Sequence, residues 1–173
     1  MGVRRATFDD AEAIERIRVE TWRATYRGLL PDDLIDQLQP NVERRRERLR
    51  SSSRSEINLV VDEGDVVGYA FAGRERAHDP NYTGEVYAIY VLPAAQGLGH
   101  GRALIGECAR ALAAEGMTSM LIWVLRENRI GRGFYERLGG TVVREKPLEE
   151  FPGAEDHIEV AYGWKDTRPL VAG

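Results

Sequence analysis

Apolar residues in the first part of the chain recur every three or four positions, which is the period of a helix with one buried face. They stand at Ala13, Ile14, Ile17 and Trp22. Thr7 followed by Asp10 is a capping-box pattern just ahead of them. The pattern therefore predicts a short strand over 3–6 and then a helix that ends near Tyr26.

From position 57 onward the pattern is mostly that of β-strands. Two β-rich runs over 57–73 are joined around Gly64, which is a hairpin signal. Pro93 must end the strand before it, because proline cannot donate to a central ladder. The remaining elements are expected as strands over 84–92, 119–125, 141–145 and 156–164, and as helices over 32–38, 41–54, 128–138 and from the glycine turn to Ala114. This order predicts an α/β fold, a mixed sheet with helices packed on it.

Length and charge narrow the class of protein. A chain of 173 residues predicts one domain over 1–173, and no apolar run approaches the roughly 20 residues of a spanning helix, so we expect no membrane partner. The net charge of −4 argues against a nucleic-acid partner and favours cationic small molecules. Glu43 and Glu47 alternate with the arginines of 41–54, which favours a solvated helix face over a phosphate-binding patch.

The cysteine and histidine content excludes two further kinds of site. Cys108 is the single cysteine, so no internal disulfide can form, and the three histidines stand too far apart for a metal-ligand spacing. The start of the chain lacks the apolar segment of a secretory signal. We therefore expect a cytoplasmic protein without a metal centre, in which Cys108 is a small apolar core residue.

The stretch "YVLPAAQGLGHGR" places Gly97, Gly99 and Gly101 between a strand and an amphipathic helix. Unpaired amides in the first turn of a helix, together with the helix dipole of about half a positive charge, make such a turn an anion site. A tight turn without a ligand is the alternative, and three glycines favour phosphate. The dinucleotide fingerprint fails at Arg102, where it requires a third glycine, and the P-loop fails because Ala103 stands where Ser or Thr is needed.

The spacing that fits is Q-x-x-G-x-G, from Gln96 to Gly101, and in it the chain resembles the GNAT superfamily of N-acetyltransferases. "WVLRENRIGRGFYERLGG" is similar to the second signature of that family, and "VAYGW" to its final strand. The opening helix with the following "GLLP" resembles a bacterial subgroup, so the resemblance covers nearly the whole chain. Two positions depart from the pattern: Gly140 stands where many relatives have Phe, and Gln96 where others have Arg.

The resemblance implies a mixed, mostly antiparallel central sheet flanked by helices, and acetyl-CoA as the acetyl donor. Amides from Leu98 to Arg102 would hold the pyrophosphate, and the main chain near Val91 would pair with the pantetheine arm. The residues implied in cofactor binding are Tyr90, Val91, Gln96, Gly97, Leu98, Gly99, His100, Gly101, Arg102, Asn128 and Tyr135. As a plain sequence feature, Asn128 is equally a helix N-cap.

The acetyl group would pass directly to a primary amine of a small molecule, metabolite or peptide. Tyr135 matches the family tyrosine that protonates the departing thiolate, and Glu85 the position of the base in part of the family. Strand alternation predicts that Glu85 shares one face with Tyr87, Ile89 and Val91. Trp22, Tyr26, Tyr87 and His78 are expected to line the acceptor pocket.

Several alternatives stay open at this stage. One is an inactive acyl-CoA-binding regulatory module, and another is an acetyltransferase of protein N-termini or lysines. A third is an enzyme that acts on a different phosphorylated ligand, such as a nucleotide. A homodimer is compatible with the sequence.

Overall fold

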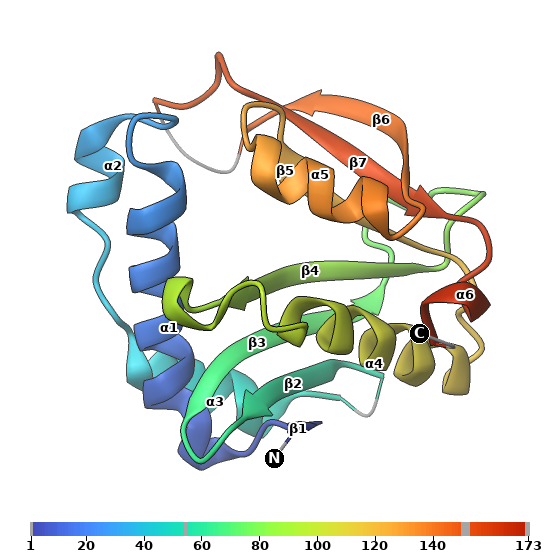
Figure 1. Cartoon of the computed structure of the whole chain (residues 1–173), viewed down its shortest axis with the longest axis horizontal. Helices are drawn as coiled ribbons and strands as arrows, with labels where there is room; N and C mark the ends of the chain where they lie inside the picture. The colour runs from blue at the N-terminus through green and yellow to red at the C-terminus, as the bar shows by residue number, and fades with distance from the viewer. Residues whose placement is uncertain (1, 54, 150–152, 172–173) are drawn as a thin grey trace.

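The computed structural model describes residues 2–53, 55–149 and 153–171. Within these ranges seven strands form one sheet in the order β1-β2-β3-β4-β5-β7-β6 (Figure 1). Every neighbouring pair is antiparallel except β4 with β5, which are parallel, so the prediction of a mixed and mostly antiparallel sheet is confirmed. The strands are β1 (Gly2–Arg5), β2 (Ile57–Asp62), β3 (Val66–Arg74), β4 (Gly84–Val91), β5 (Met120–Leu125), β6 (Thr141–Pro147) and β7 (Ile158–Trp164).

Helices cover both faces of the sheet (Figure 1). They are α1 (Ala11–Tyr26), α2 (Asp32–Asp36), α3 (Val42–Ser51), α4 (His100–Ala114), α5 (Arg129–Arg137) and α6 (Arg168–Val171), with 3-10 turns η1 (Phe8–Asp10) and η2 (Pro93–Ala95). On one face the apolar side of α4 meets α5, α6 and the sheet, with Cys108 fully buried among them. On the other face Ile14 and Ile17 of α1 pack against Tyr69 and Phe71 of β3.

The predicted helices and strands all form, with small differences at their ends. The capping box is present, since the Asp10 carboxylate accepts hydrogen bonds from both the backbone N–H and the hydroxyl of Thr7. The helix after it ends at Tyr26, as predicted. The helix after Pro31 stops at Asp36, two residues early, and the charged helix stops at Ser51. Position 54, in the predicted end of that helix, lies outside the described residues.

The sheet opens between β4 and β5. The two strands pair only where Gly84 to Val86 run beside Met120 to Ile122, although β4 continues to Val91 and β5 to Leu125. Beyond that pairing the facing edges of the two strands separate. This opening is the feature of the fold on which the candidate site depends.

A β-bulge in β4 changes which side chains share a face. The register between β3 and β4 shifts and leaves Tyr87 as an extra residue in β4. Tyr87 lies on the α1 side of the sheet, whereas Ile89 and Val91 pack into the core under α4. The prediction that Glu85 and Tyr87 share one face with Ile89 and Val91 is therefore wrong, because simple alternation does not continue across a bulge.

In the described ranges, none of the helices combines the length and hydropathy needed to cross a membrane. The same ranges contain no group of three or more His, Cys, Asp or Glu side chains arranged to hold a metal ion.

Candidate active site

The glycine turn lies at the amino end of α4, and each of its glycines has its own structural reason. Gly97 and Gly99 have φ of +78° and +90°, the left-handed region that residues with a Cβ rarely adopt. Gly101 lies in the first helical turn, where a Cβ would stand 3.2 Å from Cζ of Phe134. The turn is thus shaped by backbone conformation and by contact with α5, and both would be needed with or without a ligand.

The same geometry leaves a row of amides at the start of α4 without partners inside the helix. The helix begins at His100, and its first hydrogen bond within the helix runs from the Ala103 N–H to the Gly99 carbonyl at 3.0 Å. The amides of His100, Gly101 and Arg102 have no partner within the helix. Leu98, in the turn itself, is 70% exposed, so an anion can approach this row from solvent. The arrangement fits a pyrophosphate group.

The main chain of Val91 faces the opening between β4 and β5. Because the Leu92 N–H donates to the Val67 carbonyl at 2.9 Å, the peptide groups of Val91 point away from β3. The side-chain amide of Gln96 donates to the Val91 carbonyl at 3.0 Å. The Val91 N–H therefore faces the opening, and Gln96 braces the turn against the end of β4.

Tyr135 lies on α5, on the α4 side of the sheet. Its ring centre is 5.7 Å from that of Tyr162 and 6.3 Å from that of Trp164, and the residue is 6% exposed. Burial, together with the nearby Tyr90 phenol, raises the pKa of Tyr135 and keeps its hydroxyl protonated. Asn128 caps α5 by accepting a hydrogen bond from the Gly131 N–H at 2.9 Å, so the N-cap interpretation is confirmed.

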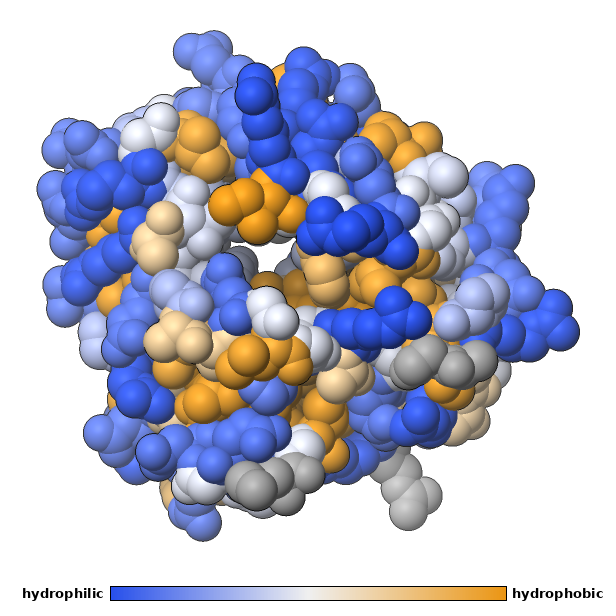
Figure 2. Space-filling model, in the orientation of Figure 1, coloured by the Kyte–Doolittle hydropathy of each residue, from blue (hydrophilic) through white to orange (hydrophobic). Residues whose placement is uncertain are grey.

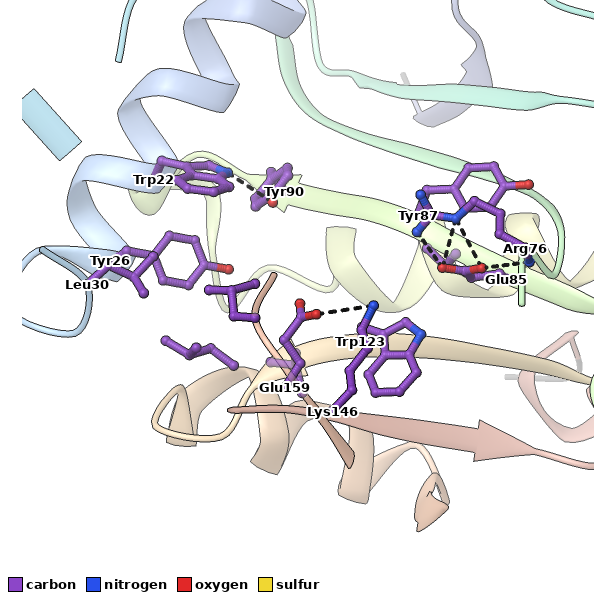
Figure 3. Close-up of a pocket in the computed structure, with 14 residues that line it drawn as sticks. Trp22, Tyr26, Leu30, Arg76, Glu85, Tyr87, Tyr90, Trp123, Lys146 and Glu159 are labelled. Atoms are coloured by element: carbon purple, nitrogen blue, oxygen red, sulfur yellow. Dashed lines mark hydrogen bonds and ion pairs between the residues drawn. The ribbon is translucent and has the colours of Figure 1, made fainter. Parts of the chain in front are cut away.

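A pocket on the α1 side spans the two separated strands, and Figure 2 shows the surface hollowed near the centre of the molecule. Its walls carry aromatic rings, two carboxylates and two cationic side chains (Figure 3). The lining residues are Trp22, Tyr26, Leu30, Arg76, Glu85, Val86, Tyr87, Tyr90, Trp123, Val124, Leu125, Lys146, Leu148 and Glu159. The predicted lining residues Trp22, Tyr26 and Tyr87 are among them.

Three aromatic residues form one end of the pocket (Figure 3). The indole N–H of Trp22 donates to the Tyr90 hydroxyl at 3.0 Å, and the Trp22 ring meets Tyr26 edge to face with centres 4.9 Å apart. Burial raises the pKa of the Tyr90 phenol, an effect partly offset by the hydrogen bond from Trp22. This end of the pocket therefore presents neutral hydroxyls and ring faces.

Glu85 lies at the other end, where it is held by Arg76. Its carboxylate accepts hydrogen bonds from the Arg76 backbone N–H at 3.1 Å, from Nη2 at 2.6 Å and from Nε at 3.2 Å to each oxygen. Glu85 is 2% exposed, and the Arg76 guanidinium lies 4.7 Å from the centre of the Tyr87 ring. The Tyr87 hydroxyl donates to the Arg74 carbonyl at 2.6 Å. The Tyr87 ring therefore lines this end of the pocket, while its hydroxyl is hydrogen-bonded to a backbone carbonyl.

The prediction that His78 lines the pocket is wrong. His78 is exposed in the loop after β3, with φ of +55°, and it is not among the lining residues. Sequence reasoning in turn missed Arg76, Trp123, Lys146 and Glu159. Trp123 stands inside the second signature, but nothing in a linear pattern shows which face it takes. Lys146 and Glu159 meet only through the register of β6 with β7.

The model of the acetyltransferase (GNAT) family matches residues 12–140. N-acetyltransferase YuaI of Bacillus subtilis is 34% identical over 169 residues, which cover 97% of this chain and 95% of that protein.

The fold is shared with solved acetyltransferase structures, and the following two are among them. PaiA N-acetyltransferase from Thermoplasma acidophilum, in complex with coenzyme A, has a TM-score of 0.73 at 18% identity, over 94% of this chain and 98% of that one. The yncA structure from Salmonella typhimurium, with acetyl-CoA, has a TM-score of 0.73 at 24% identity, over 95% and 92%. The family model and the relative from Bacillus subtilis, which both cover most of the chain, show that this protein belongs to the GNAT family of acetyltransferases.

Proposed function

We propose that the protein transfers the acetyl group of acetyl-CoA to a primary amine held in the pocket on the α1 side of the sheet. The observation that carries this proposal is the placement of the two half-sites. The first amides of α4 and the N–H of Val91 lie at the end of β4, and the pocket is lined from β4 and β5 across the same opening. A donor on one side and an acceptor on the other would meet between the two strands.

The residues present fit acetyl-CoA. The amides at the start of α4 would hold the pyrophosphate, with the Arg102 side chain close by, and the Val91 N–H would pair with the pantetheine arm as an added strand. PaiA and yncA, which share the fold, contain coenzyme A and acetyl-CoA respectively. These observations support acetyl-CoA as the acetyl donor.

Acetyl-CoA supplies a thioester whose carbonyl carbon is attacked by the amine nitrogen, so that a C–N bond forms and the C–S bond breaks with its electron pair on sulfur. Tyr135 gives its phenolic proton to the sulfur. The amine must first lose a proton, because an alkylammonium has a pKa of about 10.4. Glu85 is the carboxylate that the sequence predicts for this step, and to accept a proton it would have to give up a hydrogen bond from Arg76. Holding both substrates in one site supplies most of the rate enhancement.

Calorimetric titration of acetyl-CoA into protein stripped of coenzyme A tests the proposal, with dephospho-CoA, ATP and NAD as competitors. We expect saturable one-to-one binding that ATP and NAD do not displace, followed by thiol release when a primary amine is added. Absence of binding by folded protein would mean that the glycine turn is structural. Binding without thiol release for any amine, peptide amines included, would favour a regulatory acyl-CoA-binding module instead.

A further inference from the structure

The pocket contains a second carboxylate, Glu159, at the point where the sheet opens. Glu159 pairs with Leu125 across β5 and β7 and with Lys146 across β6 and β7. Leu125 lies beyond Ile122, the last residue of β5 that pairs with β4. Side chains directly opposite each other on neighbouring strands share a face. Glu159 and Lys146 therefore stand together beside the opening, on the side of the acceptor pocket.

The Glu159 carboxylate points into the pocket, toward the space that the Tyr26 hydroxyl also faces (Figure 3). Its side chain is 17% exposed, and Oε2 lies 3.5 Å from Nζ of Lys146, which in turn lies 4.5 Å from the centre of the Trp123 ring. Burial raises the pKa of Tyr26, and the charge of Glu159 contributes to the same rise. The negative charge of Glu159 thus acts on Tyr26, another residue that lines the pocket.

Glu85 is placed differently. It is 2% exposed, and both of its oxygens accept hydrogen bonds from Arg76 that include the short one at 2.6 Å. Separating that pair would leave a buried charge poorly compensated. One contact of Glu159 is the ion pair with Lys146, and at 3.5 Å it is longer than the 2.6 Å pair between Arg76 and Glu85, so an incoming ammonium can replace Nζ of Lys146 charge for charge. Ring faces such as that of Trp123 also attract an ammonium group.

From this geometry we propose that Glu159 binds the ammonium group of the acceptor and takes its proton, and that the acceptors are primary amines on an aromatic or apolar body without a negatively charged group. This inference rests on the proposed acetyl transfer. One proton passes from nitrogen to a Glu159 oxygen, and the freed lone pair forms the C–N bond as the C–S bond breaks. Tyr135 protonates the sulfur and takes up the second nitrogen proton, and Glu159 then releases its proton to solvent.

The exclusion of anionic acceptors follows from the charges that line the pocket. Its two cationic side chains, Arg76 and Lys146, each form an ion pair with a carboxylate of the same pocket. A carboxylate on the acceptor would have to compete for one of these cations, next to Glu85 or Glu159. An amine with an apolar body needs only the aromatic walls and one carboxylate.

Phenethylamine is the probe for the test, and phenylalanine is its counterpart with a carboxylate. Both are titrated calorimetrically into wild-type protein saturated with coenzyme A, into Glu159→Gln and into Glu145→Gln. Glu145 is the matched control, because it neighbours Lys146 in β6 but pairs with Arg126 and does not line the pocket. We expect the Kd of phenethylamine to rise at least tenfold in Glu159→Gln and to stay unchanged in Glu145→Gln. Phenylalanine should bind the wild type at least tenfold more weakly than phenethylamine.

Kinetics and two further variants keep the test decisive if Glu159→Gln folds poorly. With phenethylamine as acceptor, Glu159→Gln should lower kcat at least a hundredfold and move the acidic limb of the pH profile up toward the pKa of the amine itself, and Glu159→Asp should restore part of the rate. Lys146→Met removes the competing ammonium and should lower the Kd of phenethylamine.

Equal phenethylamine binding by wild type and Glu159→Gln would overturn the role of Glu159, and so would no binding by the wild type or weaker binding by Lys146→Met. Phenylalanine binding as tight as that of phenethylamine would overturn the acceptor class. Each of these results leaves the proposed function standing as long as acetyl-CoA binds, whereas absence of acetyl-CoA binding would refute the proposed function itself.

Discussion

The Tyr135 hydroxyl is the side-chain acid that the proposed reaction would use. Burial raises the pKa of Tyr135, so the group is protonated at neutral pH but is a weak donor. A thiol has a pKa of about 8.5, which makes the thiolate a fair leaving group even without an acid. We therefore expect Tyr135→Phe to lower kcat about 100-fold, at the low end of the range of general acid–base catalysis. The KM for acetyl-CoA should barely change. Both kinetic constants are measured from the steady-state rate of thiol release.

Tyr82→Phe is the matched control for that variant. Tyr82 is also buried, at 5% exposed, but it precedes β4 in the chain and packs beside Gly163 of β7. Its loss should leave kcat unchanged. An unchanged kcat in Tyr135→Phe, or an equal loss in both variants, would show that Tyr135 serves packing alone.

The sequence predicts those site residues that belong to a continuous motif, but not those that only long-range strand pairing brings to the pocket. Tyr135 and the glycines belong to a continuous motif, and a motif can be read from the chain in order. Glu159 stands 74 positions after Glu85, in the last strand, and nothing in its neighbours marks it as facing a pocket. Its place is decided by the register of β7 with β5 and β6, which is set by long-range pairing.

At the scale of elements, α1 is joined to α3 by one buried carboxylate. Glu15 is 3% exposed, and it forms ion pairs with Arg18 at 2.9 Å and Arg45 at 2.7 Å and accepts a hydrogen bond from the Asn41 N–H at 2.8 Å. Burial alone would raise the pKa of Glu15, but its partners outweigh burial and the pKa is lowered. The stabilisation is therefore complete above the unfolded pKa of about 4.3 and is lost as pH falls through the folded value.

Glu15→Gln should lower the free energy of unfolding by about 3 kcal/mol at neutral pH, because Arg45 would remain nearly buried without its counter-charge. Urea denaturation measures the change, and repeating it at lower pH should show the difference between wild type and variant shrinking. Glu12→Gln, on the exposed side of the same helix, is the control and should have almost no effect. A loss that does not depend on pH would mean that shape rather than charge holds the two helices together.

The turn before α4 allows a second test at this scale. Gly99 is the N-cap of α4, with φ of +90°, and Gly116 follows the other end of the helix with φ of +80°. A Cβ at either position would meet no atom within 4 Å. Alanine at either site should cost about 1 kcal/mol of stability through backbone strain. Only Gly99→Ala should also weaken acetyl-CoA binding, by tenfold or more in calorimetry. The substitution would change the direction of the first amides of α4, which would hold the pyrophosphate. Equal affinity in the two variants would contradict a binding role for this turn.

Element positions were largely predictable, but the arrangement of the strands was not. Apolar periodicity and turn residues located each helix and strand because those signals are local. The bulge at Tyr87 and the place of β7 between β5 and β6 depend on pairing between segments far apart in the chain. Gly140 illustrates the same limit: a Cβ there would stand 2.6 Å from Cζ2 of Trp164, a contact that explains the glycine only once both strands are placed.

At the scale of the whole molecule, the rate at which the Cys108 thiol is labelled measures how often the protein unfolds around it. It is 0% exposed on α4, inside the core that joins this helix to the sheet. Burial raises the pKa of Cys108 to about 12, whereas an unfolded thiol ionises near 8.5. The native protein keeps its proton where the unfolded chain loses it, so this contribution to stability is complete below about pH 8.5 and is lost as pH rises toward 12. Thiol labelling at about pH 8 should therefore be very slow in the folded protein and immediate in denaturant.

Acetyl-CoA should slow that labelling, because its proposed site needs the amino end of α4 held beside the end of β4. A ligand that binds only the folded state at about 100 times its Kd stabilises it by about 2.7 kcal/mol. When reclosing is faster than labelling, the rate follows the population of the open form, so it should fall about a hundredfold. Gly99→Ala should show a smaller protection at the same acetyl-CoA concentration, and Gly116→Ala the full protection. Labelling that saturating acetyl-CoA leaves unchanged would mean that Cys108 is reached by a local motion of α4 that the bound donor does not restrain.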